Sequence, residues 1–262
     1  MAKGASTKII SLANQKGGTG KTTAAVNIAA SLARKKKNTL LIDLDPQSNS
    51  TTALTDPLLI DSKQSVGPLL LGDVKFSEVV HECSYLPYLS LIPATLELSV
   101  TEIDLTRIPT GGNVLQKRLK EATGFEYIIC DCPPNFGTLT SNGLSVSNYM
   151  IVPMEPETFA VSGLQMLMTN IVPRILKFVN PDLKLLGILL CRVNPVRILT
   201  ANIRLELKRL YKDLLFQTEI PIDVRLPESQ SLHKPVIAYQ SWSRSATAFE
   251  KLVDEILERI GE

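Results

Sequence analysis

A glycine-rich segment near the beginning of the chain constrains the possible folds more than any other part of the sequence. Residues 16–23 read KGGTGKTT and lie between a β-branched run at 8–13 and an Ala- and Leu-rich run at 22–33. The first run predicts a strand and the second predicts a helix. A strand, a glycine loop and a helix that begins with Lys-Thr are typical of a phosphate-binding loop. The segment therefore predicts an α/β fold that contains a phosphate site.

The residue types of this loop match the needs of phosphate binding. Glycines let backbone N–H groups close around phosphate oxygens, and the helix amino terminus adds unpaired donors and the positive end of its dipole. We expect Lys21 to reach the β- and γ-phosphates and the Thr22 hydroxyl to be a ligand of Mg²⁺. The residues expected to surround the phosphates are Gly17, Gly18, Thr19, Gly20, Lys21 and Thr22.

The loop departs from the usual pattern at its first position. The pattern G-x-x-x-x-G-K-[ST] requires glycine where this chain has Gln15. A second lysine, Lys16, comes just before the glycine pair. Lys16 is either a solvated loop charge or an additional cation directed at phosphate, and the loop alone does not separate these two interpretations.

Acidic residues end two of the expected strands. The run at 38–45 is a buried-strand pattern that closes on Asp43 and Asp45, and the run at 125–131 closes on Asp131. Carboxylates at the carboxyl ends of strands beside a phosphate loop are where Mg²⁺ and an attacking water are held. A turn-forming Asp-Pro at 45–46 is the simpler interpretation of one acid, but it does not explain two acids spaced two residues apart.

The remaining pattern alternates strands with helices. We expect strands at 88–92, 149–153, 183–192 and 216–220. We expect helices at 96–105, 114–122, 139–147, 160–179 (with a possible kink at Pro173), 198–213 and at the end of the chain, and irregular to helical structure at 56–84. Such alternation predicts a doubly wound, mostly parallel sheet with helices on both faces and a ligand at the carboxyl edge of the strands. Without a linker or repeat, residues 1–262 are interpreted as one domain.

Composition excludes several classes of protein. The hydrophobic fraction of 44% is enough for a core, but no apolar run approaches the ~18 residues of a membrane span. We find no signal peptide in Met1–Thr7 and expect a cytoplasmic protein. The four cysteines, Cys83, Cys130, Cys132 and Cys191, lack paired C-x-x-C spacing. Buried reduced thiols are therefore favoured over a cysteine metal site.

Positive charge is concentrated in one part of the chain. The net charge is only +2, but residues 192–225 contain seven basic residues against four acidic ones. The basic residues are Arg192, Arg197, Arg204, Lys208, Arg209, Lys212 and Arg225. This segment is either a nucleic-acid surface or a solvated helix face.

At this point the motifs resemble a known family. Residues 16–23 resemble the deviant Walker A motif of the ParA/MinD group of P-loop ATPases, residues 41–47 (LIDLDPQ) its Walker A′ motif, and residues 128–134 (IICDCPP) its Walker B motif. The resemblance runs nearly from end to end. Blocks at 152–157, 220–226 and 234–236 are similar to the partition ATPases called ParA or Soj.

The resemblance implies an ATPase that forms a face-to-face homodimer with two ATP molecules trapped at the interface. Lys16 would reach the phosphates of the partner's nucleotide, and Asp45 would orient the attacking water. Thr23 would contact the α-phosphate. The implied catalytic residues are Lys16, Lys21 and Asp45, the implied Mg²⁺ residues are Thr22, Asp43 and Asp131, and the positions matched to adenine are Asn194, Pro221 and Asp223.

The resemblance also implies partners. In the ParA branch the ATP-bound dimer binds double-stranded DNA without sequence preference, and a ParB-like protein stimulates an otherwise slow hydrolysis. Arg197 and Arg225 occupy positions of DNA-contacting arginines in that branch. This chain has Ile222 where the branch often has arginine, and Ser241-Trp242-Ser243-Arg244 where the branch often has Pro-Arg-Ser-Arg.

Four functions can be compared with these nucleotide-binding motifs. Partition of plasmid or chromosome DNA by a nucleoid-associated ATPase is one, and positioning of a protein cargo on the nucleoid is another that the sequence does not separate from it. A MinD-like membrane switch would require a basic amphipathic carboxyl terminus, whereas residues 246–262 contain five acidic and two basic residues. A relative of the nitrogenase iron protein would require cluster cysteines, but Cys130 and Cys132 lie within the Walker B segment.

Overall fold

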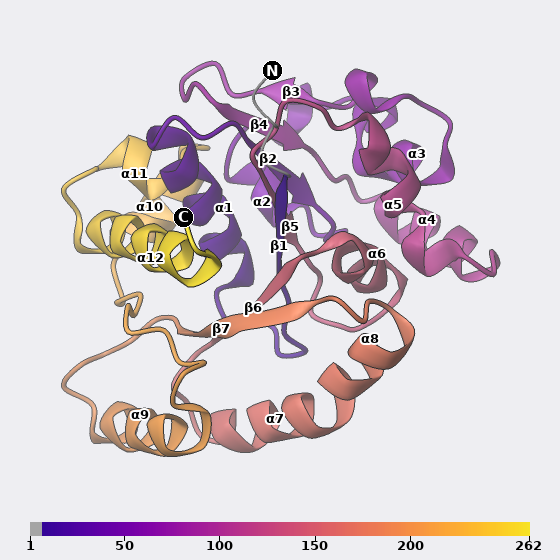
Figure 1. The fold of residues 1–262 in the computed structure, drawn as a ribbon. Helices are drawn as coiled ribbons and strands as arrows, with labels where there is room; N and C mark the ends of the chain where they lie inside the picture. Colours follow the sequence, from indigo (N-terminus) through magenta and orange to yellow (C-terminus); the bar gives the residue numbers. More distant parts are fainter. Residues whose placement is uncertain (1–6) are drawn as a thin grey trace.

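Residues 7–262 are the part of the chain that the computed structural model describes, and they form a layered α/β structure around a seven-stranded sheet (Figure 1). The expectation of no signal peptide concerns mainly residues 1–6, which lie outside the described residues. The strands are β1 (Lys8–Leu12), β2 (Thr39–Asp43), β3 (His81–Glu82), β4 (Leu89–Ile92), β5 (Tyr127–Asp131), β6 (Tyr149–Met154) and β7 (Lys184–Leu190).

The sheet is parallel except at one edge. Its strand order is β3-β4-β2-β5-β1-β6-β7, and only the short β3 runs antiparallel to its neighbour β4. Every residue of β2 and β5 is buried. Their nearly continuous Ile and Leu runs are typical of parallel strands that are covered on both faces. The expected mostly parallel, doubly wound sheet is therefore confirmed.

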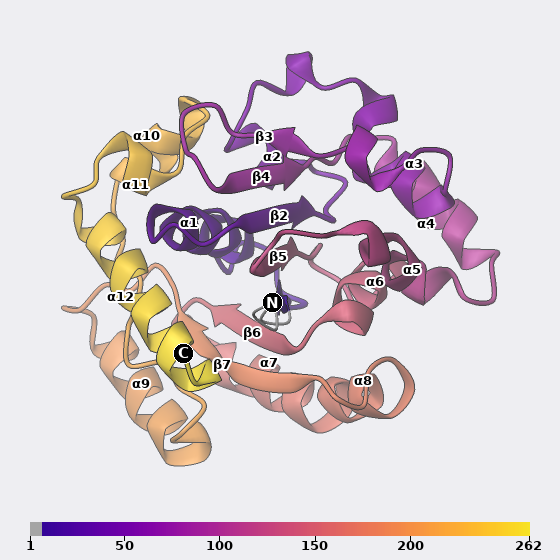
Figure 2. The ribbon, with the colours of Figure 1, turned by 45° about the horizontal axis from the view of Figure 1, so that its top comes forward.

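Helices cover both faces of this sheet (Figure 2). One face carries α1 (Lys21–Arg34), α10 (Arg225–Ser231), α11 (Val236–Tyr239) and α12 (Arg244–Ile260). The other helices are α2 (Asn49–Thr52), which follows β2, and α3 (Val66–Leu71), α4 (Leu98–Thr106), α5 (Leu115–Arg118), α6 (Thr138–Val146), α7 (Ala160–Met166), α8 (Val172–Phe178) and α9 (Ile198–Tyr211). Short 3₁₀ turns lie at 57–59, 62–64, 76–78, 111–113 and 119–121.

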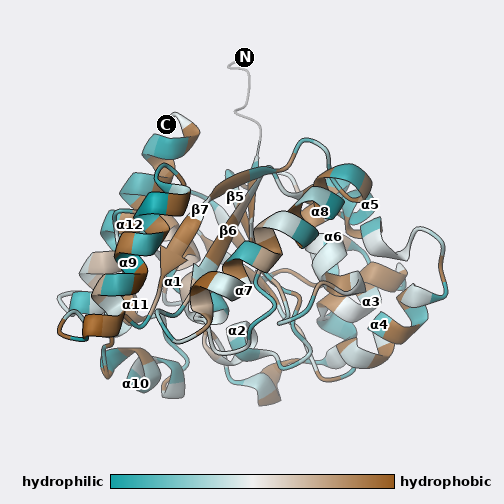
Figure 3. Cartoon of the chain, turned by 90° about the horizontal axis from the view of Figure 1, so that it is seen from below, coloured by the Kyte–Doolittle hydropathy of each residue, from teal (hydrophilic) through white to brown (hydrophobic). Residues whose placement is uncertain are grey.

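Each face of the sheet has its own apolar core. On the first face, Phe249, Leu252 and Ile256 of α12 pack with α1 against residues of the sheet. On the second face, residues such as Leu98, Leu139 and Leu164 of the covering helices do the same. Figure 3 shows apolar residues in the strands β6 and β7, whereas α12 alternates between hydrophilic and apolar residues. Such alternation places one stripe of the helix on the sheet and the other in solvent.

The structure interrupts the long helix expected at 160–179. α7 and α8 are joined by a π-helical segment, Leu167–Ile171, that ends just before Pro173. Because proline has no backbone N–H, it cannot donate the i→i−4 hydrogen bond, and the wider π turn accommodates the missing bond. The expected kink is therefore a change of helix type.

The expected strand at 216–220 is wrong. Leu215 and Pro221, just outside that range, form only isolated bridges, to Ile188 and Val193 respectively. The segment still lies beside β7, because the Phe216 N–H donates to the Ile188 carbonyl oxygen (3.0 Å) and the Ile220 N–H donates to that of Leu190 (2.9 Å). Between these two contacts, the N–H groups of Gln217 and Thr218 donate to the carboxylate of Glu255 in α12, so the pairing with β7 is interrupted. The segment's β-branched and aromatic residues satisfy strand propensity, but that propensity depends on the neighbours that the tertiary structure supplies.

Arg259 of α12 links β7 to the chain just before this segment. Its guanidinium donates hydrogen bonds to the carbonyl oxygens of Leu186 (3.0 Å), Asp213 (3.2 Å) and Leu215 (2.7 Å). It also lies 4.1 Å from the centre of the Phe216 ring. One charged side chain thus satisfies backbone acceptors that a full strand would pair with N–H groups.

Candidate functional site

The glycine loop joins β1 to α1 and leaves an open concave surface. Gly18 and Gly20 adopt φ values of 74° and 87°, in the left-handed region that favours glycine. A Cβ at Gly17 or Gly18 would meet nothing within 4 Å, whereas a Cβ at Gly20 would lie 3.0 Å from the Cβ of Cys191. Gly20 is therefore required for packing, and Gly17 and Gly18 border space that a ligand can enter.

The two lysines of the loop point in different directions. Lys21 is 6% exposed, and its Nζ donates a hydrogen bond of 3.0 Å to the carbonyl oxygen of Lys16. The side chain of Lys16 is 51% exposed, and its Nζ lies 2.7 Å from a carboxylate oxygen of Glu157. Burial lowers the pKa of Lys21, and the negative charges of Asp131 and Asp45 partly oppose that effect.

The strand-end carboxylates meet because β2 and β5 are neighbours in register. Asp43 pairs with Asp131 across the two strands, and both residues are buried. Asp43 accepts hydrogen bonds from the Thr51 backbone N–H (2.8 Å), from the Thr51 hydroxyl (2.8 Å) and from the Asp45 N–H (3.1 Å). Oδ2 of Asp131 accepts a hydrogen bond of 2.8 Å from the Ser50 hydroxyl, but its Oδ1 has no hydrogen-bond partner among residues 7–262.

This pair of acids is electrostatically strained. Burial and the neighbouring Asp131 raise the pKa of Asp43 to about 8. Burial raises the pKa of Asp131 to about 6, although the hydroxyls of Thr22 and Ser50 lower it. When two carboxylates are buried next to each other, the ionisation of both is unfavourable unless a cation is present. The site therefore has the electrostatic character of one prepared for positive charge.

Asp45 occupies the rim of the same site. It is 7% exposed and lines a cleft that extends from the glycine loop. One of its carboxylate oxygens accepts a hydrogen bond of 2.9 Å from the Gln47 N–H. Its other oxygen receives no hydrogen bond among those of the described residues. Asp45 therefore combines a fixed backbone at the edge of the cleft with a carboxylate oxygen that the described residues leave without a donor.

A cleft of about 650 Å³ extends from the loop. One end is lined by residues of the loop together with Asp45 and Asn49, and is rich in polar groups. The other end is mainly apolar and is lined by Ile220, Pro221, Ile222, Val224, Leu226 and Pro227. This size is typical of small-molecule sites, and the arrangement suits a ligand with an anionic end and a flat apolar end.

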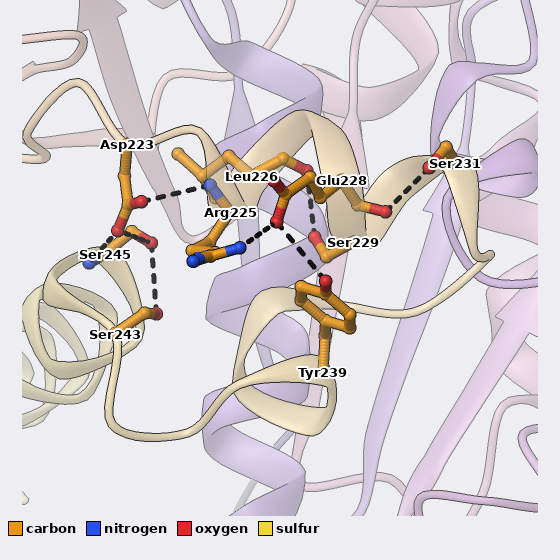
Figure 4. A network of polar contacts seen from close by, with 9 residues as sticks. All are labelled: Asp223, Arg225, Leu226, Glu228, Ser229, Ser231, Tyr239, Ser243 and Ser245. Carbon is orange, nitrogen blue, oxygen red and sulfur yellow. Dashed lines mark hydrogen bonds and ion pairs between the residues drawn. The ribbon is translucent and has the colours of Figure 1, made fainter.

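The expected adenine positions fall in different places. Pro221 and Asp223 line the cleft, but Asn194 is not among its lining residues and accepts a hydrogen bond from the Val196 N–H instead. The Asp223 carboxylate accepts hydrogen bonds from the Arg225 N–H (3.0 Å) and from the Ser245 N–H (3.1 Å) and hydroxyl (2.8 Å) (Figure 4). Asp223 therefore joins α10 to α12 at the edge of the cleft.

Several polar residues of the site escaped the sequence reasoning. Gln230 lines the cleft and donates a hydrogen bond of 3.2 Å to the hydroxyl of Thr23, which lies 207 residues earlier in the chain. Ser50 and Thr51 hold the two buried acids, and Glu157 pairs with Lys16. Nothing in the sequence indicated which hydroxyl of the polar run at 46–52 contacts which carboxylate.

The two arginines matched to DNA contacts differ in their surroundings. Arg197 is exposed at the beginning of α9 and forms no ion pair within residues 7–262. Arg225 pairs with Glu228 at 2.6 Å, and the same carboxylate oxygen accepts a hydrogen bond from Tyr239 (Figure 4). Of the other basic residues at 192–225, Arg192 pairs with Glu155 and Arg204 pairs with Glu219.

The cysteines lie where the composition predicted. Cys130, Cys132 and Cys191 are buried and unpaired, and Cys83 is partly buried. Burial raises the pKa of the Cys130 and Cys191 thiols to about 12. Across residues 7–262, no three His, Cys, Asp or Glu side chains gather as a protein-only metal site. Within the same residues, no helix combines the length and the apolar character that crossing a bilayer requires.

Comparisons with known proteins agree with this geometry. A family model described as an AAA domain matches residues 7–185. The chain is 38% identical over 252 residues to the sporulation initiation inhibitor protein Soj of Bacillus subtilis, covering 95% of this chain and 98% of that protein. It is 36% identical over 256 residues to the chromosome partitioning protein ParA of Myxococcus xanthus, covering 96% of this chain and 88% of that protein.

A solved structure extends the agreement to three dimensions. The cobyrinic acid a,c-diamide synthase of Mycobacterium smegmatis, solved with a bound ATP analog and magnesium, superposes with a TM-score of 0.81. It is 30% identical in sequence, and the match covers 97% of this chain and 96% of that one. With an AAA domain over most of its length and Soj and ParA relatives over nearly all of it, the chain belongs to the ParA/Soj family of partition ATPases.

Proposed function

We propose that this chain is a Mg²⁺-dependent ATPase that dimerises around two ATP molecules and binds non-specific DNA as the ATP-bound dimer. A ParB-like partner accelerates its slow hydrolysis, and the cycle partitions plasmid or chromosome DNA on the nucleoid. The partition assignment is favoured over a protein cargo because the Myxococcus xanthus relative is a chromosome partitioning protein. Its cofactors are ATP and Mg²⁺, as in the Mycobacterium smegmatis structure.

The described residues fit ATP and Mg²⁺. The open surface at Gly17 and Gly18 leaves room for phosphate oxygens near backbone N–H groups, and the buried Lys21 adds a fixed positive charge. Oδ1 of Asp131 is a buried acceptor without a donor, which is costly unless a cation or a bound water satisfies it. Magnesium sites commonly combine one or two carboxylates with substrate phosphates, so Asp131 and Thr22 are sufficient from the protein.

Each residue then has a physical task. Lys21 and the loop N–H groups hold the phosphates in one orientation, and Thr23 lies where it can contact the α-phosphate. Asp45 orients a water toward the terminal phosphate with its free carboxylate oxygen, while Asp43 keeps the backbone of Asp45 in place through their hydrogen bond. When bound, Mg²⁺ neutralises charge that develops on the phosphate oxygens.

The opposite orientation of the two lysines is the main support for the proposed dimer. Lys21 is directed into its own loop, whereas Lys16 extends outward from the same loop. Its ion pair with Glu157 is about half exposed, and exposed ion pairs contribute little to stability. A phosphate group of a second copy would therefore displace Glu157 easily, and Lys16 would stabilise charge in the manner of an arginine finger.

The basic segment supports the DNA step. Four of its cations, Arg197, Lys208, Arg209 and Lys212, are exposed and form no ion pair within the described part of the chain. They lie on α9 or next to its ends. Arg225 joins them when phosphate replaces Glu228, since that exposed pair is also weak. Contacts of lysine and arginine with phosphate give affinity without sequence preference.

Binding to an unrelated DNA duplex tests the proposal. We expect fluorescence anisotropy to show binding with a slowly hydrolysed ATP analogue and Mg²⁺, little binding with ADP, and a steep loss of affinity as salt increases. Binding that is independent of nucleotide or insensitive to salt would contradict the partition mechanism. Light scattering of the same samples reports whether the ATP-bound form is a dimer.

A further inference from the structure

A hydroxyl group of α2 holds one of the buried acids from a distant part of the sequence. Ser50 Oγ donates a hydrogen bond of 2.8 Å to Oδ2 of Asp131, and the two residues are 81 positions apart. Both side chains are fully buried. The other carboxylate oxygen, Oδ1, is buried as well, and no group in the described part of the chain forms a hydrogen bond with it. The contact therefore makes the two oxygens of one carboxylate unequal.

The next residue holds α2 firmly in this position. Thr51 donates to Asp43 from both its N–H and its hydroxyl, and the same hydroxyl accepts a hydrogen bond of 2.9 Å from the Ala94 N–H. Ser50 and Thr51 are both buried. Because the backbone of α2 is tied to β2 and to the end of β4, the Ser50 hydroxyl cannot follow Asp131 if that carboxylate rotates. Ser50 thus acts on Asp131 as a fixed donor.

We propose that Ser50 is a positioning residue of the magnesium site: by engaging Oδ2 it sets the rotation of the Asp131 carboxylate and presents Oδ1 to the cation or to its bound water. The inference rests on the proposed function, since it concerns the magnesium-dependent binding of ATP. It goes further by assigning a role to a residue that neither the phosphate loop nor the strand ends include. Groups that orient a metal ligand from behind commonly change metal affinity about 10–100-fold when removed.

The alternative is that Ser50 merely satisfies a buried polar group. In that case its removal would destabilise the fold and weaken nucleotide binding whether or not magnesium is present. A positioning role predicts something more selective: the affinity for nucleotide without metal stays the same, and only its enhancement by magnesium is reduced. The two readings therefore differ in the coupling between metal and nucleotide.

The experiment compares the Ser50→Ala variant with wild type by titrating a fluorescent, non-hydrolysable ATP analogue in EDTA and across a Mg²⁺ series. We expect unchanged affinity in EDTA and a Mg²⁺ concentration for half-maximal enhancement that rises by about 10-fold. Ser31→Ala is the matched control, because Ser31 of α1 is also buried but its hydroxyl has no partner. That control should titrate like wild type.

A second variant keeps the test valid if Ser50→Ala destabilises the fold. Ser50→Cys keeps a weak S–H donor at similar size, and its half-maximal Mg²⁺ concentration should fall between those of wild type and Ser50→Ala. Equal Mg²⁺ curves for wild type and the folded Ser50 variants would overturn the inference and leave the proposed function intact. If magnesium fails to enhance nucleotide binding in wild type itself, the proposed function fails together with the inference.

Discussion

The Nζ of Lys21 donates a hydrogen bond to the carbonyl oxygen of Lys16, so that one lysine of the phosphate loop braces the backbone of the other. The brace consumes a donor of Lys21 inside the loop and leaves the Lys16 side chain free to extend outward, where it pairs with Glu157. The same six-residue segment, Lys16–Lys21, thus separates a charge that serves its own loop from a charge that is available to another molecule.

Replacing each lysine separately should therefore have different effects. Lys21→Ala should reduce ATP affinity at least about 10-fold, because a buried charge-assisted contact with phosphate is worth about 1.5–3 kcal/mol. Lys16→Ala should bind ATP normally but fail to dimerise, and its turnover should fall on the order of 10³-fold, as when a trans-acting arginine is lost. Nucleotide titration and light scattering measure the two effects. A Lys16→Ala protein that dimerises like wild type with ATP would exclude the cross-subunit role.

Removing the carboxylate of Asp45 should separate assembly from hydrolysis. Asp45→Ala keeps the phosphate loop and the buried acids, so ATP and Mg²⁺ should still assemble the dimer. Without an oriented water, hydrolysis should decrease by about 10²–10⁴-fold, and the ATP-bound dimer should accumulate. Size-exclusion chromatography with light scattering measures this accumulation. A monomer at saturating ATP and Mg²⁺ would show that Asp45 is needed for assembly instead.

Releasing Lys16 from its internal partner should favour assembly slightly. Glu157→Gln removes the ion pair, and because exposed ion pairs are weak, ATP-dependent dimerisation should tighten by no more than about fivefold. Glu155→Gln is the matched control, since it lies two residues away and pairs with Arg192 instead. If both variants change the dimer dissociation constant equally, the effect belongs to the net charge of the loop and not to Lys16.

The buried acids should make stability and metal binding depend on pH in opposite directions. The pKa values of Asp131 and Asp43 are raised to about 6 and about 8 in the folded protein, so the fold binds more protons than the unfolded chain above pH 4. Their contribution to the free energy of unfolding is therefore present at low pH and is lost as the pH rises toward 8. Magnesium-dependent binding of ATP should strengthen over the same range, because a cation requires the ionised carboxylate.

Thermal unfolding and nucleotide titration between pH 5 and pH 8 measure both trends. Asp43→Asn removes one of the two acids and should flatten the pH dependence of the unfolding temperature of the nucleotide-free protein. A profile that is unchanged in this variant would assign the dependence to other groups.

Removing an unpaired cation of the basic segment should weaken DNA binding and its response to salt. Arg197→Ala should lower the slope of log affinity against log salt by about 0.9, the value for one lost phosphate contact. Arg107→Ala is the control, because Arg107 is an exposed arginine just after α4 and pairs with Asp104 of that helix. Equal slopes for wild type and Arg197→Ala would remove Arg197 from the DNA surface.

Much of the fold was predictable because its signals are local. The loop at 16–23 and the acids at 43, 45 and 131 each follow a strand pattern, and parallel strands bring their carboxyl ends to one edge. The segment at 216–220 was predicted wrongly for the complementary reason. Its residues favour a strand, but Glu255, more than thirty residues later, accepts the N–H groups of Gln217 and Thr218 and so interrupts the pairing with β7.

The sequence by itself determined the phosphate loop, the second lysine, the order of the acids and the family to which they point. Only the tertiary structure decided that Lys21 lies inside the loop and Lys16 outside, that Ser50 engages one oxygen of Asp131, and that Asp223 joins two helices at the edge of the cleft. The physical reason is that a hydrogen bond requires direction and distance within a few tenths of an ångström. Strand register and helix packing set those quantities between residues that are far apart in the chain.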